Sequence, residues 1–249
     1  IIVVVGVFVG LQVQEWSARR AMSERTARLM QRLESDFGVD VLVARSLLDY
    51  HTEVARHAQM TLNDITRQAP ISDDQLLIAA HRASQFNRFN RTSGIFEELV
   101  STGGLELVSS SKIGSIAALF YKTTIISDYE TDGKSSEYRR LYRSLVPIDV
   151  QLAVDDQCGD RSRTIDEIIN EKSVIGYSCT LDFPADRVAE AAEIIRREAA
   201  LVPALRHRIA TLATQNRDFA TIVEAIRPYR ADRETLERSS LGVVFGIQE

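Results

Sequence analysis

The sequence is poor in the residues that interrupt helices, with 12 Gly and 5 Pro among 249 residues. An all-β sandwich needs turn residues about every 8–12 positions, and this chain supplies far fewer. The hydrophobic content of 45% and the charged content of 26% are ordinary for a globular protein and leave ample apolar material for a core. The sequence therefore predicts a mainly α fold.

Cysteine is also scarce. Cys158 and Cys179 are the only two, and no C-x-x-C pair or chelating pair of histidines accompanies them, which argues against a zinc site. In an oxidising compartment we expect the two to form a disulfide, and closing a loop of this length stabilises a fold by about 3 kcal/mol. In a reducing compartment they would be two small hydrophobic residues.

Lysine is rare, so arginine carries most of the positive charge, and the net charge is −5. Proteins that bind nucleic acids normally carry a strongly basic surface. A chain with a negative net charge gives no sign of such a basic surface, and we expect no nucleic-acid partner.

Long hydrophobic runs are absent except for one at residues 1–11, which Trp16, Arg19 and Arg20 follow closely. An apolar helix that reaches an aromatic residue and then cations is typical of a segment leaving a bilayer. A run of this length rises about 16 Å, whereas the hydrocarbon core is about 30 Å thick. We therefore expect residues 1–16 to be the N-terminally incomplete end of one transmembrane helix, with the Trp and the two Arg at the membrane interface.

Two other interpretations of this run stay open. It could be a secretory signal peptide, whose apolar region is short, or a buried segment of a soluble core. The residues after Leu11, which include Gln12, Gln14 and Glu15, lack the small-residue pattern of a cleavage site.

Two features predict opposite sides of the membrane for the rest of the chain. Several arginines between Arg19 and Arg32 favour a cytoplasmic domain by the positive-inside rule. The cysteine pair favours the periplasm, where disulfides persist. We expect a bacterial inner-membrane protein with a periplasmic domain, and the cytoplasmic side is the alternative.

Residues 17–70 are predicted to form one long juxtamembrane helix. Apolar residues recur there mostly at steps of three or four positions, which is one stripe of an α-helix. Gly38 is the expected site of a bend, and Pro70 is the expected end.

Residues 71–249 are predicted to form a helical extramembrane domain. Ser72–Gln75 and Thr164–Glu167 match the capping box that begins a helix, and Gly103–Gly104 matches a helix end. The expected helices cover residues 72–87, 95–100, 105–129, 136–146 and most of 184–239, and Asp132–Gly133 is expected to break the helical path between the third and the fourth. Residues 148–163 are expected to be irregular. Residues 174–181 are expected to be a short strand or an extended strap.

No catalytic constellation emerges from the sequence. His51 and His57 lie six positions apart on different helix faces, so they do not form a chelating pair, and each of the four histidines is expected to be solvated or in the core. Ser178 lies in a Gly-Tyr-Ser-Cys-Thr segment that is similar to a nucleophile elbow but lacks the second Gly. The aspartates at 155–160 fit no EF-hand spacing. We expect no catalytic residue, cofactor or metal.

Three stretches resemble a family of uncharacterised bacterial single-pass membrane proteins. Residues 11–20, Leu-Gln-Val-Gln-Glu-Trp-Ser-Ala-Arg-Arg, are similar to the Leu-Gln-x-x-x-Trp-Asn pattern that ends the family's spanning helix, with Ser17 in place of Asn. Residues 29–36 and 99–108 are similar to two later segments, and the second half is not matched. The resemblance implies one N-terminal anchor with a helical extramembrane domain, and it carries no catalytic residue.

We therefore expect a non-catalytic accessory subunit of a larger membrane complex, possible assemblies being photosynthetic or respiratory. Its partners would be the lipid bilayer and other membrane-protein subunits. The alternatives are a single-pass sensor and a membrane-anchored hydrolase that uses Ser178 or Cys179. The candidate partner contacts are Phe86, Phe89, Val243, Val244 and Phe245.

Overall fold

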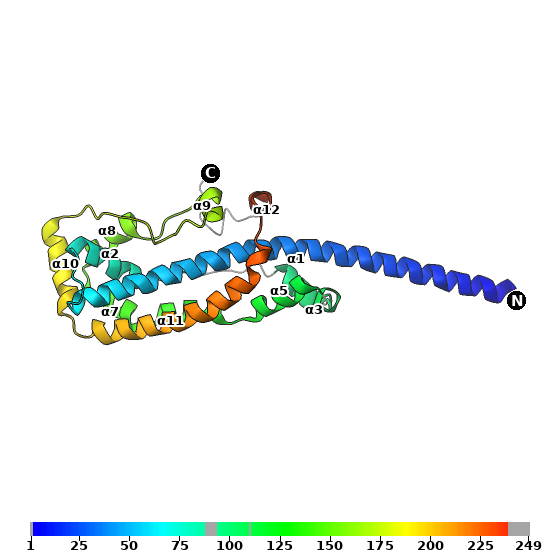
Figure 1. The fold of residues 1–249 in the computed structure, drawn as a ribbon, viewed down its shortest axis with the longest axis horizontal. Helices are drawn as coiled ribbons and strands as arrows, with labels where there is room; N and C mark the ends of the chain where they lie inside the picture. The colour runs from blue at the N-terminus through cyan, green and yellow to red at the C-terminus, as the bar shows by residue number, and fades with distance from the viewer. Residues whose placement is uncertain (1, 88–93, 110, 239–249) are drawn as a thin grey trace.

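The structure is a computed structural model that describes residues 2–87, 94–109 and 111–238, with the side chains of the first helix described from Gln12 onwards. These residues are mainly helical and contain no β-strand (Figure 1), which confirms the predicted fold class at that level. For residues 174–181, which the sequence predicts to be a short strand or an extended strap, the structure shows an extended segment without strand pairing.

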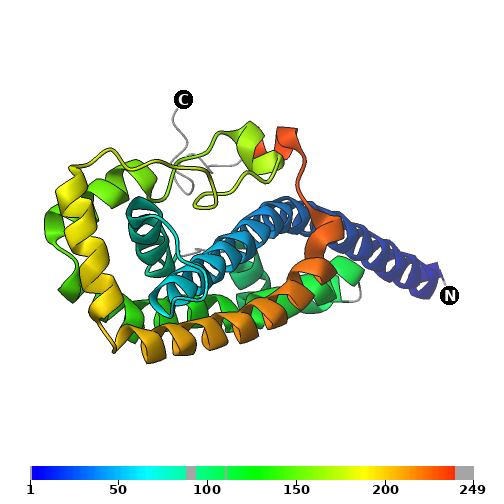
Figure 2. The same cartoon turned by 60° about the vertical axis from the view of Figure 1, so that its left-hand side comes forward.

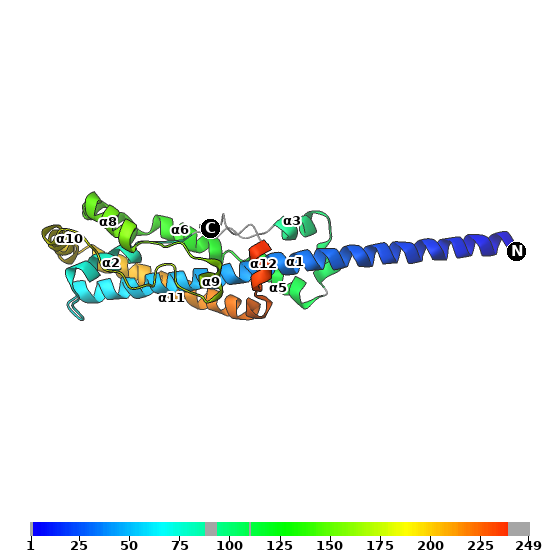
Figure 3. The same ribbon diagram turned by 90° about the horizontal axis from the view of Figure 1, so that it is seen from above.

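The first helix, α1 (Ile2–Ile65), is one uninterrupted element of 64 residues, about 95 Å long. Its N-terminal part projects from the bundle (Figures 1 and 3), and residues 12–28, called the arm below, are exposed except for half-buried Thr26. The apolar stripe enters the bundle at Leu29. Within the part of the chain that the structure describes, no helix carries an apolar stretch long enough to cross a bilayer.

α1 runs through Gly38, where the sequence predicts a bend, without a break. A Cβ atom at Gly38 would lie 3.0 Å from both the carbonyl oxygen of Tyr229 and the backbone nitrogen of Ala231. The Ala231 N–H donates to the Gly38 carbonyl at 3.0 Å. Glycine at this position therefore lets another segment of backbone cross α1 closely.

Two helices pack along the bundled part of α1. α11 (Leu201–Ile226) runs antiparallel to it, and α2 (Asp73–Ala83) lies against its C-terminal end (Figures 1 and 2). α10 (Ala185–Arg197) packs on α2 at the end of the bundle far from the arm. The remaining elements are α3 (Gly94–Ser101), α4 (Leu105–Ser109), α5 (Lys112–Lys122), α6 (Ile125–Ser135), α7 (Glu137–Leu145), α8 (Ile148–Cys158), α9 (Ile165–Ile169), the 3-10 turn η1 (Arg227–Tyr229) and α12 (Arg233–Arg238).

The core has two large parts. Near the arm, α1 packs against α3, α5, α6 and α11, and the rings of Phe37 and Phe120 meet edge to face with centroids 5.6 Å apart. At the far end, α2, α7, α8 and α10 enclose a second cluster that includes Tyr138 and Tyr142. Because α1 contributes to both clusters, the predicted juxtamembrane helix is also the central helix of the bundle.

The far end of α1 is fixed by a buried carboxylate. Asp64 accepts a hydrogen bond from the Ile71 N–H at 2.9 Å and from Nε of Arg196 at 3.0 Å. Arg196 also donates from Nη1 to Asp73 at 2.6 Å. One arginine of α10 thus joins the end of α1 to the start of α2.

The single helix predicted for residues 105–129 is wrong, because α4, α5 and the start of α6 divide this stretch. Ser111 begins α5, since its hydroxyl accepts a hydrogen bond from the Gly114 N–H at 3.1 Å. Thr123 ends α5 with an extended backbone, ψ 142°. Hydroxyl groups at caps thus interrupt an apolar periodicity that continues across them.

The break predicted at Asp132–Gly133 is also wrong, because α6 continues to Ser135. Glycine serves packing here: a Cβ atom at Gly133 would lie 2.4 Å from the Cβ of Phe86.

The irregular segment predicted for residues 148–163 is wrong in its first part, which forms α8. Val150, Val154 and Cys158 recur at four-residue steps and are fully buried. Exposed Ile148 and Leu152 place apolar residues on the opposite face as well, and this obscures the helical stripe in the sequence.

One predicted capping box forms and the other does not. Thr164 and Glu167 exchange backbone and side-chain hydrogen bonds at 3.1 and 3.3 Å, as predicted. Ser72 is the N-cap of α2, but its hydroxyl donates to the Asp74 carboxylate instead of binding the backbone. α2 also ends at Ala83, earlier than predicted, whereas α3 and α7 closely follow their predicted ranges.

The Gly133–Phe86 contact predicts that Gly133→Ala destabilises the fold by about 1–3 kcal/mol, because the new methyl group overlaps a Cβ that cannot swing away. Thermal unfolding followed by circular dichroism measures this change. Gly94→Ala is the matched control, since a Cβ at Gly94 meets no atom within 4 Å. Equal unfolding temperatures for the two variants would contradict the packing assignment.

Candidate functional site

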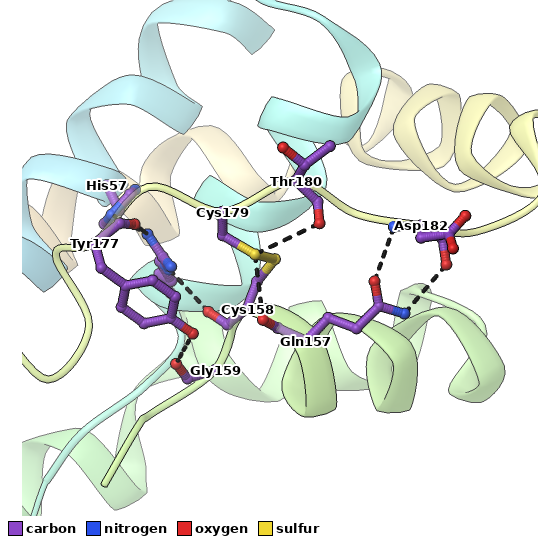
Figure 4. Close-up of a disulfide and its surroundings, with 9 residues drawn as sticks. His57, Gln157, Cys158, Gly159, Tyr177, Cys179, Thr180 and Asp182 are labelled. Atoms are coloured by element: carbon purple, nitrogen blue, oxygen red, sulfur yellow. Dashed lines mark hydrogen bonds between the residues drawn. A yellow bond between two sulfur atoms is a disulfide. The ribbon is translucent and has the colours of Figure 1, made fainter. Parts of the chain in front are cut away.

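Residues 159–184 join α8 to α10 and form a strap that contains α9. Cys158, the last residue of α8, forms a disulfide with Cys179 of the strap, and their Cα atoms are 5.7 Å apart (Figure 4). Beside the bridge, the Asp182 N–H donates to Oε1 of Gln157 at 2.8 Å, and Nε2 of Gln157 donates to the Asp182 carbonyl at 3.1 Å. The strap is therefore fixed to the C-terminal end of α8.

Ion pairs hold the strap near α9. Glu171 accepts from Nη2 of Arg45, on α1, at 2.6 Å and from Nη1 of Arg230 at 3.2 Å. Its φ of 56° lies in the left-handed region, where glycine usually follows a helix end, and the Lys172 N–H closes that end on the Glu167 carbonyl at 2.8 Å. A side chain in this conformation costs about 1 kcal/mol, and the two ion pairs are placed to offset it.

Arg82 lies where α2, α8 and the strap meet, and it is 2% exposed. Its Nε donates to the Cys158 carbonyl at 2.9 Å, and its Nη1 donates to the Tyr177 carbonyl at 2.9 Å. The guanidinium also lies 4.6 Å from the centre of the Tyr177 ring, whose hydroxyl donates to the Gly159 carbonyl at 2.9 Å (Figure 4). Burial lowers the pKa of Arg82, which remains a cation facing the negative end of α8.

Two further arginines bind the C-terminal end of α2. Arg139 of α7 donates from Nη1 to the Ser84 carbonyl at 2.6 Å, and Arg208 of α11 donates from Nη2 to the Gln85 carbonyl at 2.9 Å. The Ser84 carbonyl, at the C-cap, belongs to the group that a helix end leaves without a partner, and the Gln85 carbonyl lies one residue beyond it. Burial lowers the pKa of Arg208 to about 10. Arg82, Arg139 and Arg208, called the arginine centre below, thus join α2, α7, α8, α11 and the strap.

Tyr50 brings α1 into this centre. Its side chain is 1% exposed, and its hydroxyl lies 3.0 Å from each carboxylate oxygen of Asp160. Asp160 itself reaches solvent, but the crowding protein around it reduces its hydration and raises its pKa, against the hydrogen bond from Tyr50. Asp160 forms no ion pair with any described residue, while Arg82 and Arg139 donate to carbonyl groups.

His81 lies at the edge of the same centre. Its Nε2 is 3.1 Å from the Asp155 carboxylate, and its Nδ1 is 3.4 Å from the Tyr142 hydroxyl. Burial lowers the pKa of His81, against the attraction of solvent-exposed Asp155. His81 is therefore neutral at pH 7, and its contact with Asp155 is a hydrogen bond.

His51 and His57 are buried on α1, and burial lowers the pKa of each to about 3. His51 stacks on Tyr129 with ring centroids 4.0 Å apart, and its ring nitrogens make no hydrogen bond of good geometry to a described residue, although the Asn87 backbone lies near enough to oppose the fall in pKa. His207 is exposed on α11. The prediction of core or solvated histidines is confirmed for all four.

The arrangement offers little to a hydrolase. The disulfide removes the thiol of Cys179, and Ser178 is exposed without a hydrogen bond to any histidine that the structure describes. Across the described ranges, no three metal-binding side chains come together. Most donors of the centre bind backbone carbonyls, while Nη2 of Arg82 and Nε of Arg208 are buried without a hydrogen-bond partner among the described residues.

The predicted interface residues lie on the arm. Trp16 is 62% exposed, and the guanidinium of Arg20 lies 5.7 Å from the centre of its ring. Arg19 pairs with Glu15 at 3.2 Å, and Arg20 pairs with Glu24 at 3.1 Å. None of these side chains packs on the bundle.

Phe86, a predicted partner contact, is half-buried against its own chain, with the Arg139 guanidinium 4.9 Å from its ring centre. The other predicted partner contacts lie outside the described residues: Phe89, Val243, Val244 and Phe245.

Sequence reasoning missed the arginine centre, although Arg82 carries a signal. It lies in the run from Leu76 to Ala83, in which every residue is buried. A cation in a helix that is buried on all sides must find internal partners. Arg139 and Arg208 lie in polar segments and offer no such signal.

No protein-family model, curated protein or solved structure matches the chain. The resemblance of residues 11–20, 29–36 and 99–108 to single-pass membrane proteins therefore stays a prediction.

The disulfide predicts that the double variant C158A/C179A unfolds with a free energy about 3 kcal/mol lower than that of the native chain. Chemical denaturation measures it. Reductant should lower the stability of the native chain by a similar amount and leave the double variant unchanged. A native chain that is insensitive to reductant would contradict a structural role for the bridge.

Buried His51 predicts an acid-sensitive fold. Its pKa of about 3 lies below the usual 6.5, so the unfolded chain binds a proton that the folded chain excludes, and stability falls as the pH drops below about 6.5. His51→Phe keeps the stacking on Tyr129 and should remove on the order of 2 kcal/mol of this loss between pH 7 and about pH 4.5. Denaturation curves at several pH values measure it, with His207→Gln, at an exposed position of α11, as the comparison variant.

Proposed function

We propose that this chain is a non-catalytic, membrane-anchored accessory subunit of a larger bacterial inner-membrane complex, with its helical bundle on the periplasmic side. The apolar residues 1–11 would belong to a single spanning helix, and Trp16, Arg19 and Arg20 would lie at the interface.

The observation that carries this proposal is the continuity of α1. One helix connects the apolar start, the exposed arm and the core of the bundle. The arm leaves Val13, Trp16 and Met22 between 48 and 62% exposed, although apolar side chains grouped on one segment normally meet lipid or another protein. An anchor, an arm and a rigid body are suited to holding partner subunits in position.

Two further observations support the proposal. The disulfide between α8 and the strap fits an oxidising compartment, which favours the periplasm over the cytoplasm. The three arginines donate to backbone carbonyls at or near helix ends and in the strap, which fits a body that positions partners and performs no reaction.

Purification of the full chain from native membranes in mild detergent tests the proposal. A photo-cross-linking residue at exposed Ser23 of the arm should capture other membrane proteins, whereas the same residue at exposed Arg206 of the bundle serves as the matched comparison for chance contacts. Membrane subunits should co-purify in fixed ratio. A chain that elutes alone and gives no arm cross-links would overturn the accessory role.

A sensor is the second candidate, because a groove of about 360 Å³ lies between α1, the strap and α11. Its lining combines apolar Leu42 and Val223 with charged Asp49 and Arg163, and such mixed linings are typical of ligand sites. α1 would connect such a groove to the arm. Purification as a homo-oligomer without other subunits would favour this candidate.

A further inference from the structure

We propose that the arm binds anionic lipid headgroups through a collar of four arginines, Arg19, Arg20, Arg25 and Arg28. The inference rests on the proposed membrane anchor, and it adds the chemistry of the lipid that the anchor selects.

Charge is segregated along the chain. The arm carries the four arginines of the collar and two glutamates, while the whole chain has a net charge of −5. The arm therefore carries a net charge of +2, and the rest of the chain carries −7. An anionic membrane surface would attract the arm and repel the bundle, so the two charges together orient the molecule away from the bilayer.

The collar surrounds the helix. At about 100° per residue, the four arginines leave no gap wider than about 120° around the axis of α1. A membrane surface and its potential act on all faces of a helix that passes through them, so arginines on every face contribute to the attraction. The distribution around the axis therefore fits a helix that passes through a charged membrane surface.

The guanidinium groups are available. Among the described residues, Arg19 and Arg20 form ion pairs only with glutamates one turn away, and the side chains of both pairs are at least 55% exposed, so these contacts are weak. Arg25 and Arg28 are exposed and make no ion pair or side-chain hydrogen bond within the described part of the chain. A guanidinium binds phosphate with two parallel N–H groups, which matches the phosphodiester of a lipid headgroup.

The spacing along the axis also fits. Arg19 lies about 4.5 Å beyond Trp16 along the helix, and Arg28 lies about 18 Å beyond it. The polar layer of a bilayer is roughly 5–8 Å thick on each side, and the surface potential extends about 8–10 Å further. With Trp16 at the interface, the first two arginines reach the headgroups and the last two remain within or close to the range of the surface potential.

Lipid enrichment around the reconstituted full chain tests the collar. The chain is incorporated into vesicles of about 80% phosphatidylcholine and 20% phosphatidylglycerol, recovered in small polymer-bounded lipid discs, and the two lipids are quantified by mass spectrometry. Since each surface arginine favours an anionic lipid layer by about fivefold, we expect the discs to be enriched at least about threefold in phosphatidylglycerol. The variant R19Q/R20Q/R25Q/R28Q should lose this enrichment.

The matched control is R140Q/R143Q/R206Q/R217Q, which removes four exposed arginines from the bundle and should keep the enrichment. A native chain that incorporates into the vesicles without enrichment overturns the collar and leaves the anchor standing. Loss of enrichment in both variants also overturns it, because net charge alone would then explain the effect. A chain that enters neither these vesicles nor pure phosphatidylcholine vesicles overturns the proposed anchor itself.

Discussion

The far half of the bundle depends on guanidinium groups buried against the ends of helices. α2 is buried from Leu76 to Ala83, so the carbonyls at its C-terminal end have little water to bind. Each buried carbonyl without a partner would cost about 1–3 kcal/mol. Arg139 donates to the C-cap carbonyl of α2, Arg208 donates to the carbonyl one residue beyond it, and Arg82 donates to the last carbonyl of α8. Arginine suits this role because its planar fork reaches two carbonyls from different segments at once, which the single ammonium of lysine does less well.

α1 unites the molecule because it takes part in every cluster that holds the bundle together. Its apolar stripe packs in both main core clusters, Tyr50 binds Asp160 of the strap, and Arg45 binds Glu171 of the same strap. The bundle is therefore built around α1, and the strap is fastened to α1 as well as to α8. Movement of the arm would be transmitted to all of these contacts.

The helical class, α1 and the main helix starts could be predicted from periodicity, scarce glycine and capping residues. The short helices could not, because Ser111 and Thr123 interrupt one apolar pattern and Ile148 and Leu152 obscure another. Gly133 misled the prediction of a helix break, since it accommodates Phe86 within unbroken α6, whereas Gly38 lets a second segment of backbone cross α1 closely. The cysteine pair could be named from spacing, whereas the arginine centre needs tertiary structure, because helices far apart in sequence supply its donors and acceptors.

A single rod from Ile2 to Ile65, fixed at its far end by Arg196 and Asp64, sets both the standoff and the azimuth of the bundle relative to whatever holds its beginning. Each residue added to or removed from the arm would shift the bundle by about 1.5 Å and turn it by about 100°. A change of seven residues would shift it by about 10 Å yet turn it by only about 20°. The length of the arm therefore sets the rotation of the bundle about the axis of α1 as well as its distance along that axis. An insertion can preserve the rotation while it changes the distance.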